Sequence, residues 1–439
     1  MPGLAIPVPG GAARPGLCTD CGVSRMSDPK ACGRACQFIR PDYPGLETAT
    51  HGRPADPARG DEAHFGVTLA MHRARLAPPA HGAQWSGLTT AIAAEALASG
   101  RVDAVLAMTA DPEDRWRPRP AIVTDPEAMA ACRGMRMGYA PLLALVEPAI
   151  AAGHRRLAVV AIPCQTYALR VLEARLALDR LYVIGTPCSD NTTTEKFHAF
   201  LAALDDRPDG IAYLEFCPDY RVEIRYDDGR PTRRVPFLDL PLADLPADFF
   251  PLTCRTCVDY TNRLADITVG YMGGHGSCSD APGAQWVIVR NTRGAELLDA
   301  LGPRLERLAP VDCGRRRSAV EGFMTNAARA AGGLPLRRLP RWLRPLVSWA
   351  QPRFGPRGLE FARARVEMKA IEAVLGLRRA HPRRLKSMVP DHVWRLVAPY
   401  GLAPGEGERP APVPAIRDRR PGGPTAEALP DATPAPPPR

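Results

Sequence analysis

RLAVVAIPCQTYALRVLEARL (residues 156–176) and RLYVIGTPCSDNTTTEKFHAFLAAL (residues 180–204) share one pattern. Each begins with a short apolar run typical of a buried strand, passes through a Pro-Cys pair, and ends in a segment with helical periodicity. Strands that alternate with helices in this way predict an α/β fold. The two cysteines, Cys164 and Cys188, directly follow the carboxyl ends of their strands, where open α/β sheets bind ligands.

A second cysteine pair lies in TCRTCVDYTNRLADITVGYMGG, residues 253–274. Two residues separate Cys254 from Cys257, so both thiolates can reach one metal ion or one iron–sulfur cluster from a single turn. A single cysteine at a strand end is most often a packing residue. Two at equivalent strand ends, together with this pair, supply four thiolates from three loops and favour a cluster.

Four more cysteines lie near the N-terminus in CTDCGVSRMSDPKACGRAC, at positions 18, 21, 32 and 36. The gaps between them are two, ten and three residues. Four thiolates within so short a segment can hold an iron–sulfur cluster, and structural zinc is the alternative.

The segment QWSG, residues 84–87, leads into LTTAIAAEALASG, which has the composition of a helix ended by Gly100. A Ser-Gly turn at a helix start presents backbone N–H groups that suit a pyrophosphate, although most such turns are ordinary helix caps. The sequence contains no GxGxxG fingerprint, P-loop or HExxH motif. A nicotinamide-binding Rossmann domain is therefore not supported.

The 439 residues carry a net charge of +10. Residues 303–395 hold 19 Arg and 2 Lys against 7 Asp and Glu, a net +14, so the remainder sums to −4. Such a basic segment suits an acidic protein partner or an anionic membrane surface, and a solvated Arg-rich surface is the alternative. Nucleic-acid-binding signatures are missing. Since neither a signal peptide nor an apolar run of about 18 residues is present, we expect a cytoplasmic protein.

These features predict an α/β protein with a mixed-sheet core, an N-terminal iron–sulfur segment and a basic helical C-terminal region. The expected boundaries are a disordered segment at 1–16, a cluster segment at 17–79, an α/β core at 80–302, the basic helices at 303–402 and a disordered tail at 403–439.

The chain resembles the iron–sulfur flavoproteins typified by the beta subunit of the deazaflavin-reducing hydrogenases. The matching pieces occur in the family's order over most of residues 80–300. They are QWSGLTTAIAAEAL, VDAVLA, IPCQTYALR, VIGTPCSDNTT, CRTCVDYTNRLADITVGYMGG and WVIVRNTRGAELL.

The resemblance implies one FAD and two 4Fe-4S clusters. It implies that the core at 80–302 holds the flavin and an iron–sulfur cluster. One cluster is expected on Cys18, Cys21, Cys32 and Cys36, and the other on Cys164, Cys188, Cys254 and Cys257. Members of the family often read CxxCGxC near the N-terminus; here Ser24 stands at the third position, and Cys32 is available in its place. We expect flavin contacts from Gln84, Trp85, Ser86, Gly87, Thr89, Thr90, Gln165 and Asn191.

Three further pieces resemble a branch of the family found in phototrophs, whose members reduce the 8-vinyl group of divinyl chlorophyllides. They are EFCPDYRVEIRYDDG, PFLDLPLADLPADFFPLTCRTCVDYTN and MVPDHVWRLVAPYGL. The branch implies an oxidoreductase of (bacterio)chlorophyll biosynthesis that acts on a CH–CH group with ferredoxin as electron donor. From their positions in the sequence, Tyr271, His275 and Asp190 are the candidates for the proton donor.

Three alternatives remain beside this expectation: reduction of 7-hydroxymethyl chlorophyll a, a deazaflavin-dependent reaction, and an electron-transfer subunit of a larger complex. A homo-oligomer and peripheral contact with the photosynthetic membrane are also left open.

Overall fold

The computed structural model describes residues 18–39, 41–217, 219–246, 248–270, 283–329 and 340–409. The predicted disordered segment 1–16 and most of the predicted tail 403–439 lie outside these ranges. Residues 403–409 are described, and the carboxylate of Glu408 there pairs with Arg378 at 2.7 Å.

A sheet of eight strands forms the centre of the fold, in the order β11-β1-β10-β9-β5-β4-β2-β3. Strands β9, β5, β4 and β2 run parallel, whereas β3, β10, β1 and β11 each pair antiparallel with a neighbour. The predicted mixed α/β core is thus confirmed. The strands are β1 (Ala70–Leu76), β2 (Ala104–Ala110), β3 (Pro118–Val123), β4 (Arg156–Ala161), β5 (Arg180–Gly185), β9 (Ile267–Gly270), β10 (Gln285–Val289) and β11 (Leu305–Leu308).

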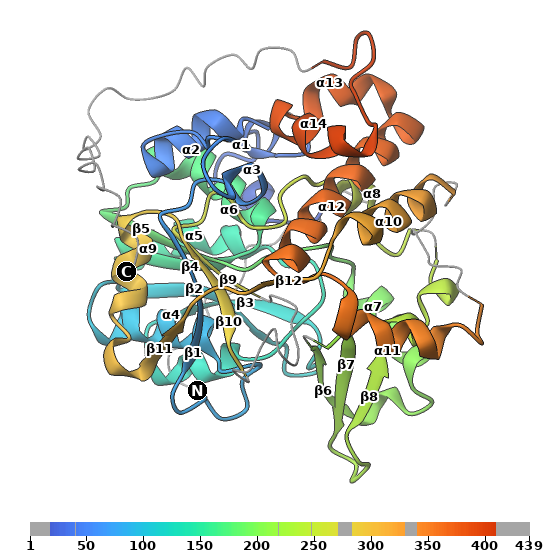
Figure 1. Cartoon of the computed structure of the whole chain (residues 1–439). Helices are drawn as coiled ribbons and strands as arrows, with labels where there is room; N and C mark the ends of the chain where they lie inside the picture. Colours follow the sequence, from blue (N-terminus) through green and yellow to red (C-terminus); the bar gives the residue numbers. More distant parts are fainter. Residues whose placement is uncertain are drawn as a thin grey trace, which may run out of the picture.

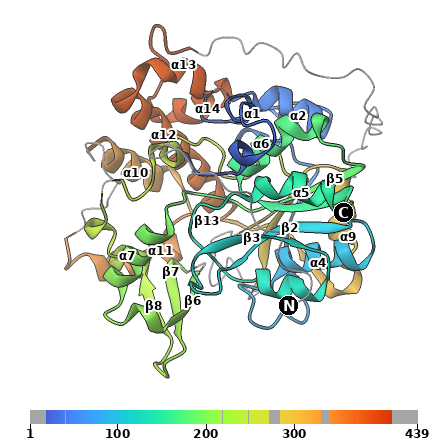
Figure 2. The same ribbon diagram turned by 180° about the vertical axis from the view of Figure 1, so that it is seen from behind.

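Helices cover both faces of this sheet (Figures 1 and 2). In β5, Tyr182 and Ile184 pack into one apolar layer and Leu181 and Val183 into the opposite one, as the two-residue period of a strand requires. Both faces are therefore buried, which explains the continuous apolar runs in the sequence. On one face lie α4 (Leu88–Ala98) and α9 (Thr292–Asp299); on the other lie α1 (Ala31–Ala35), α2 (Tyr43–His51), α5 (Val146–Ala151) and α6 (Pro163–Leu172).

A second sheet of three antiparallel strands stands beside the first, at the lower right of Figure 1. It has its own apolar core, in which Phe197 and Phe200 of α7 pack against the strands. Gly229, in the turn between its second and third strands, has a φ of 83°, which a glycine adopts without strain. The elements are α7 (Thr194–Leu204), β6 (Ile211–Phe216), β7 (Arg221–Tyr226) and β8 (Arg233–Pro236).

The C-terminal region is helical, as predicted, but it is not a separate appendage. Helix α12 (Leu359–Ala380) packs into the apolar cluster that also contains Trp286 of β10 and Tyr43 of α2. Strands β1 and β11, which fall in the expected segments 17–79 and 303–402, both belong to the central sheet. The remaining elements are α3 (Glu62–Phe65), α8 (Leu252–Arg255), β12 (Asp312–Cys313), α10 (Arg317–Arg329), α11 (Arg344–Phe354), β13 (Arg357–Gly358), α13 (Leu385–Met388) and α14 (Asp391–Val397).

Within the described ranges, every helix is too short or too polar to span a bilayer.

A buried ionic cluster holds the sheet and its helices together. The carboxylate of Asp266 lies 2.9 Å from the guanidinium of Arg170 on α6 and 2.8 Å from that of Arg293 on α9. It also accepts the Val183 N–H of β5 at 2.7 Å. Although burial alone raises the pKa of Asp266, the two guanidinium groups and these hydrogen bonds hold it well below the usual value.

Replacing Asp266 with Asn should lower the free energy of unfolding by about 3–5 kcal/mol, because the buried guanidinium of Arg170 loses one of its two carboxylate partners and keeps only Glu173. Urea titration of the two proteins measures this difference. Asp299→Asn, which removes an exposed partner of Arg307, is the matched control and should change stability little. An equal loss in both variants contradicts the prediction.

Candidate functional site

The two Pro-Cys pairs leave the sheet side by side. Strands β4 and β5 are parallel neighbours with Ala161 opposite Gly185, and each Pro-Cys pair begins two residues after its strand ends. The Cys188 N–H donates to the Tyr260 carbonyl at 3.0 Å, which fixes its loop against the segment after the second cysteine pair. The predicted position of both cysteines, at adjacent strand ends, is confirmed.

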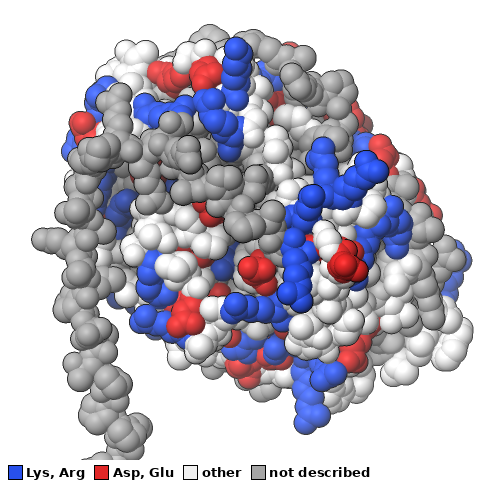
Figure 3. Space-filling view, turned by 90° about the horizontal axis from the view of Figure 1, so that it is seen from above, with Lys and Arg blue, Asp and Glu red and all other residues white. Residues whose placement is uncertain are grey.

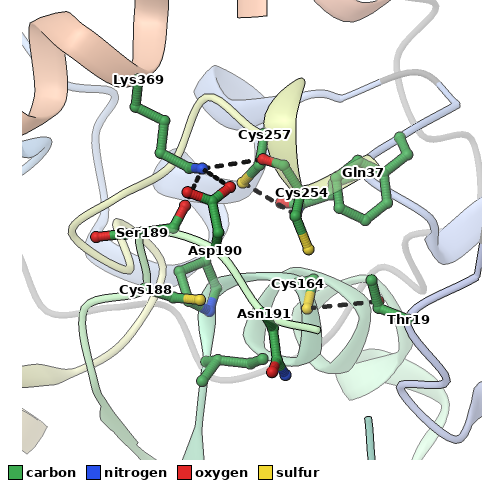
Figure 4. A pocket seen from close by; sticks show the side chains of 13 residues that line it. Thr19, Gln37, Cys164, Cys188, Ser189, Asp190, Asn191, Cys254, Cys257 and Lys369 are labelled. Carbon is green, nitrogen blue, oxygen red and sulfur yellow. Dashed lines mark hydrogen bonds and ion pairs between the residues drawn. The ribbon is translucent and has the colours of Figure 1, made fainter. Parts of the chain in front are cut away.

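Cys254 and Cys257 come from α8 and the turn that follows it, where the Cys257 N–H donates to the Cys254 carbonyl at 3.1 Å. All four cysteines of the predicted central set line one pocket that is partly open to solvent. Figure 4 shows the four thiols arranged around this space. Three loops that are distant in sequence therefore deliver their thiols to one place.

The four central thiols lie in a poorly solvated environment. Burial raises the pKa of Cys188 to about 12 and that of Cys257 to about 11, and it raises the pKa values of Cys164 and Cys254 well above the usual range. The other thiols of the set raise the pKa of Cys164 further through electrostatic repulsion. Four thiolates at this site therefore need positive charge close by.

A lysine on α12 supplies one such charge. The ammonium of Lys369 is 5% exposed and lies 3.0 Å from Asp190 Oδ1. It also donates to the Cys254 carbonyl at 2.9 Å and to the Ser189 carbonyl. Lys369 thus joins α12 to the loop after β5 and to the turn with the second cysteine pair (Figure 4).

The four N-terminal cysteines also gather in one place. Burial is the main cause that raises the pKa of Cys21 to about 12. Electrostatic repulsion from the nearby thiols of Cys32, Cys36 and Cys18 raises it in the same direction. The segment packs on the core through the Leu143 N–H, which donates to the Cys21 carbonyl at 2.9 Å. Cys32 is therefore close to the other three cysteines, whereas Ser24 is exposed.

The two cysteine sets are adjacent. The Thr19 hydroxyl, between Cys18 and Cys21, approaches Cys164 Sγ at 3.9 Å. The Gln37 amide, next to Cys36, donates to Cys257 Sγ at 3.5 Å, and the Tyr43 hydroxyl holds Gln37 by donating to its Oε1 at 3.0 Å. Hydrogen bonds from the N-terminal segment therefore end on sulfurs of the central set.

Across the described ranges, no group of three or more His, Cys, Asp and Glu side chains has the arrangement that binds a single metal ion. A 4Fe-4S cluster requires the four central sulfurs to lie close to one another, and this spacing stays a prediction. The donors around them nevertheless suit an anionic iron–sulfur cluster. They are the ammonium of Lys369, the hydroxyl of Thr19, the amide of Gln37 and the backbone N–H groups of Asn191 and Asp259.

The turn expected to bind the flavin precedes α4 as predicted. Gly87 has a φ of 83°, and a Cβ there would lie 2.8 Å from that of Ala83, so this turn requires glycine. The Ser86 hydroxyl is buried and has no hydrogen-bond partner among the described residues. Such an orphaned hydroxyl, at the start of a helix, fits a bound polar group.

Other expected flavin residues already have partners within the chain. The Gln84 amide donates to the Leu214 carbonyl of β6 at 3.0 Å, and the Trp85 N–H donates to Glu215 Oε1 at 3.2 Å. Thr89 and Thr90 are half-buried on the first turn of α4.

Gln165 and Asn191 lie elsewhere. Gln165 Oε1 accepts the Ile162 N–H at 3.2 Å and closes the first turn of α6, while Asn191 lines the pocket of the central thiols. Both therefore help to shape the loops that carry Cys164 and Cys188.

Of the three expected proton donors, Tyr271 and His275 lie outside the described residues. Asp190 lines the cysteine pocket and pairs with Lys369. Sequence reasoning missed Lys369, Thr19 and Gln37. Of these three, only Lys369 has a sequence feature that could have indicated a buried role. It is one of four lysines in the chain, and it stands within the largely apolar run VEMKAIEAVLGL, residues 366–377.

Similarity to known proteins identifies the family of this chain. Residues 71–147 match the N-terminal part, and residues 154–306 the C-terminal part, of the coenzyme F420 hydrogenase/dehydrogenase beta subunit family. The chain belongs to this family. The family resemblance expected from the sequence is confirmed.

Two relatives cover nearly the whole chain. An uncharacterised protein of Nostoc sp. is 35% identical over 88% of this chain and 94% of its own length. The chloroplastic 7-hydroxymethyl chlorophyll a reductase of Oryza sativa subsp. japonica is 35% identical over 87% of this chain and 82% of its own length. A subunit of the F420-reducing [NiFe] hydrogenase complex from Methanosarcina barkeri matches 58% of this chain and 84% of that one, with 20% identity and a TM-score of 0.49.

Replacing Lys369 with Met should lower the unfolding midpoint, because Asp190 and two carbonyl groups lose the cation that joins them. We expect a loss of about 3–5 kcal/mol, measured by urea titration. Asp190→Asn in the Lys369→Met background should add much less than it costs alone. Lys386→Met, which removes an exposed lysine of α13, is the control. Full additivity of the two site variants contradicts the proposed contact.

Proposed function

We propose that this protein reduces a chlorophyll-type tetrapyrrole with single electrons that pass from ferredoxin through two 4Fe-4S clusters to FAD. The observation that carries the proposal is the pair of adjacent four-cysteine sets, in a chain 35% identical to a 7-hydroxymethyl chlorophyll a reductase over most of its length. Cys18, Cys21, Cys32 and Cys36 would hold one cluster, and Cys164, Cys188, Cys254 and Cys257 the other.

The contacts between the two sets support electron transfer from one to the other. Thr19 and Gln37 belong to the N-terminal segment but contact sulfurs of the central set, so the two sites are separated by little more than a side chain. Hydrogen bonds to cluster sulfurs raise the reduction potential. Thr19 and Gln37 would therefore raise the potential of a cluster held by the central set, and the Asp20 N–H, 3.3 Å from Cys18 Sγ, would act in the same way on the N-terminal set.

The expected donor docks near the N-terminal set. Helices α13 and α14 lie beside α1 and α2 in Figure 1, and the ring of His392 on α14 contacts that of Tyr43 on α2 at 5.8 Å. Arg383, Arg384 and Lys386 are exposed next to α13. Figure 3, which looks onto this end of the molecule, shows short runs of basic side chains. Such a surface suits the brief encounter with an acidic electron carrier.

Electron counting links the donor to the chemistry. Reduction of a vinyl group to an ethyl group consumes two electrons and two protons, whereas ferredoxin delivers one electron at a time. A flavin supplies the missing conversion, because it accepts single electrons and passes on a pair. Gln84–Gly87, with the orphaned Ser86 hydroxyl, would hold this flavin.

We propose the C8 vinyl group of 3,8-divinyl chlorophyllide as the group reduced, on the strength of the three sequence pieces that resemble that branch. The second candidate is reduction of 7-hydroxymethyl chlorophyll a, which the rice relative favours. Conversion of a hydroxymethyl group to a methyl group, with release of water, also consumes two electrons and two protons. The same electron path therefore serves both reactions.

Turnover under anaerobic conditions separates the candidates. We expect the protein, with reduced ferredoxin, to convert divinyl chlorophyllide a to a product with two more hydrogens, identified by chromatography and mass spectrometry. Conversion of 7-hydroxymethyl chlorophyll a alone, with loss of oxygen, favours the second candidate. A fully loaded protein that accepts electrons but reduces neither substrate is instead an electron-transfer subunit, and the proposal fails.

The cofactor content gives an independent test. The anaerobically purified protein should contain about eight iron atoms and one FAD per chain, since each cubane cluster has four irons. Cys257→Ala should remove about half the iron and leave the other half, measured by colorimetric iron assay. Cys132→Ala, which removes a free cysteine outside both sets, is the matched control and should leave the iron content unchanged. Zinc in place of iron, or equal loss in the control, contradicts the assignment.

A further inference from the structure

Helix α11 and the turn before it expose an unusual amount of apolar surface. Trp342 is 78% exposed, Leu346 60%, Trp349 52% and Phe354 68%. Leu346 and Trp349 are three residues apart, so their side chains share one face of the helix, and Trp342 lies in the turn just before α11. Phe354 extends this face, because its ring lies 6.1 Å from that of Trp349. We call these four residues the α11 stripe.

The opposite side of α11 is fixed to the body of the protein. Leu343 and Val347 are partly buried, and α11 contacts the short helix Phe237–Asp239 after β8. Beyond the helix, the Tyr220 hydroxyl donates to the Pro356 carbonyl. In Figure 1, α11 lies at the outer side of the molecule, beside the second sheet. The stripe is therefore held facing outward.

The charged residues within the segment that carries the stripe all have one sign. Residues 340–358 contain four Arg and no Asp or Glu. Arg341 and Arg353 are exposed, and the Arg353 guanidinium lies 4.6 Å from the centre of the Trp349 ring. The neighbouring helices differ in this respect. On α10 and just before it, Arg317 pairs with Glu321 and Arg316 with Glu360 and Glu367.

From this combination we propose that the α11 stripe docks the protein on the surface of an anionic lipid bilayer. A helix with Trp, Phe and Leu on one face and Arg along its edges lies in the plane of the membrane interface. Indole rings prefer the boundary between headgroups and acyl chains, and Arg reaches phosphate from there. An acidic protein would match the arginines, but it would have to cover an apolar strip as well. This inference does not depend on which tetrapyrrole is reduced.

Vesicle flotation of the full-length, cofactor-loaded protein tests the proposal. We expect the protein to float with vesicles of phosphatidylcholine and phosphatidylglycerol, and much less with phosphatidylcholine alone. Trp342→Ser, Leu346→Ser and Trp349→Ser together should lower the partition coefficient by about tenfold or more. Arg341→Gln with Arg353→Gln should remove the preference for phosphatidylglycerol.

The matched control replaces the two other exposed large apolar residues of the described ranges, Ile39 and Leu69, with Ser. It should leave flotation unchanged. The proposal is overturned if the unchanged protein does not float, or if the control variant loses as much flotation as the stripe variant. It is also overturned if the stripe variant still binds vesicles but has a lower oligomer mass or a lower affinity for ferredoxin. If the triple variant fails to fold, the arginine variant decides the outcome alone.

Discussion

The ammonium group of Lys369 holds the candidate site together. It is buried beside the central thiols and contacts Asp190 and the carbonyls of Ser189 and Cys254. These groups come from the loop after β5 and from α8, whereas the lysine comes from the long C-terminal helix α12. A buried ammonium needs such partners, and the carboxylate and carbonyls equally need it. The geometry of the pocket thus depends on the docking of α12.

This dependence changes how the basic C-terminal region is understood. Much of its charge is used within the fold. Arg363, for example, lies 2.7 Å from Asp61 and 2.7 Å from Asp312, and joins α12 to α3 and to β12. The basic groups left at the surface lie mainly around α13 and along α11. One region therefore offers two separate surfaces, one near the N-terminal cysteines and one that also carries exposed aromatic rings.

The proximity of the two cysteine sets follows from the same architecture. Parallel strands β4 and β5 end at one edge of the sheet and present Cys164 and Cys188 there. The N-terminal segment packs over α6, so that Thr19 and Gln37 reach sulfurs of the central set. The proposed relay of two redox centres would need short separations. The fold brings the two cysteine sets close together by packing the N-terminal segment over the sheet edge that carries Cys164 and Cys188.

The sequence by itself determined the α/β class, the strand, Pro-Cys, helix order of two core units, and the two groups of four closely placed cysteines. Apolar runs, helical periods and the two-residue gap between Cys254 and Cys257 are local features, and local spacing encodes them. Only the tertiary structure decided that Lys369 joins the site, that Gln165 closes the first turn of α6, and that β1 and β11 belong to the central sheet. Gln37 and Cys257 are 220 residues apart in the chain. Contacts over such separations arise when the apolar faces of distant elements pack together, and no pattern within either segment specifies which partner it meets.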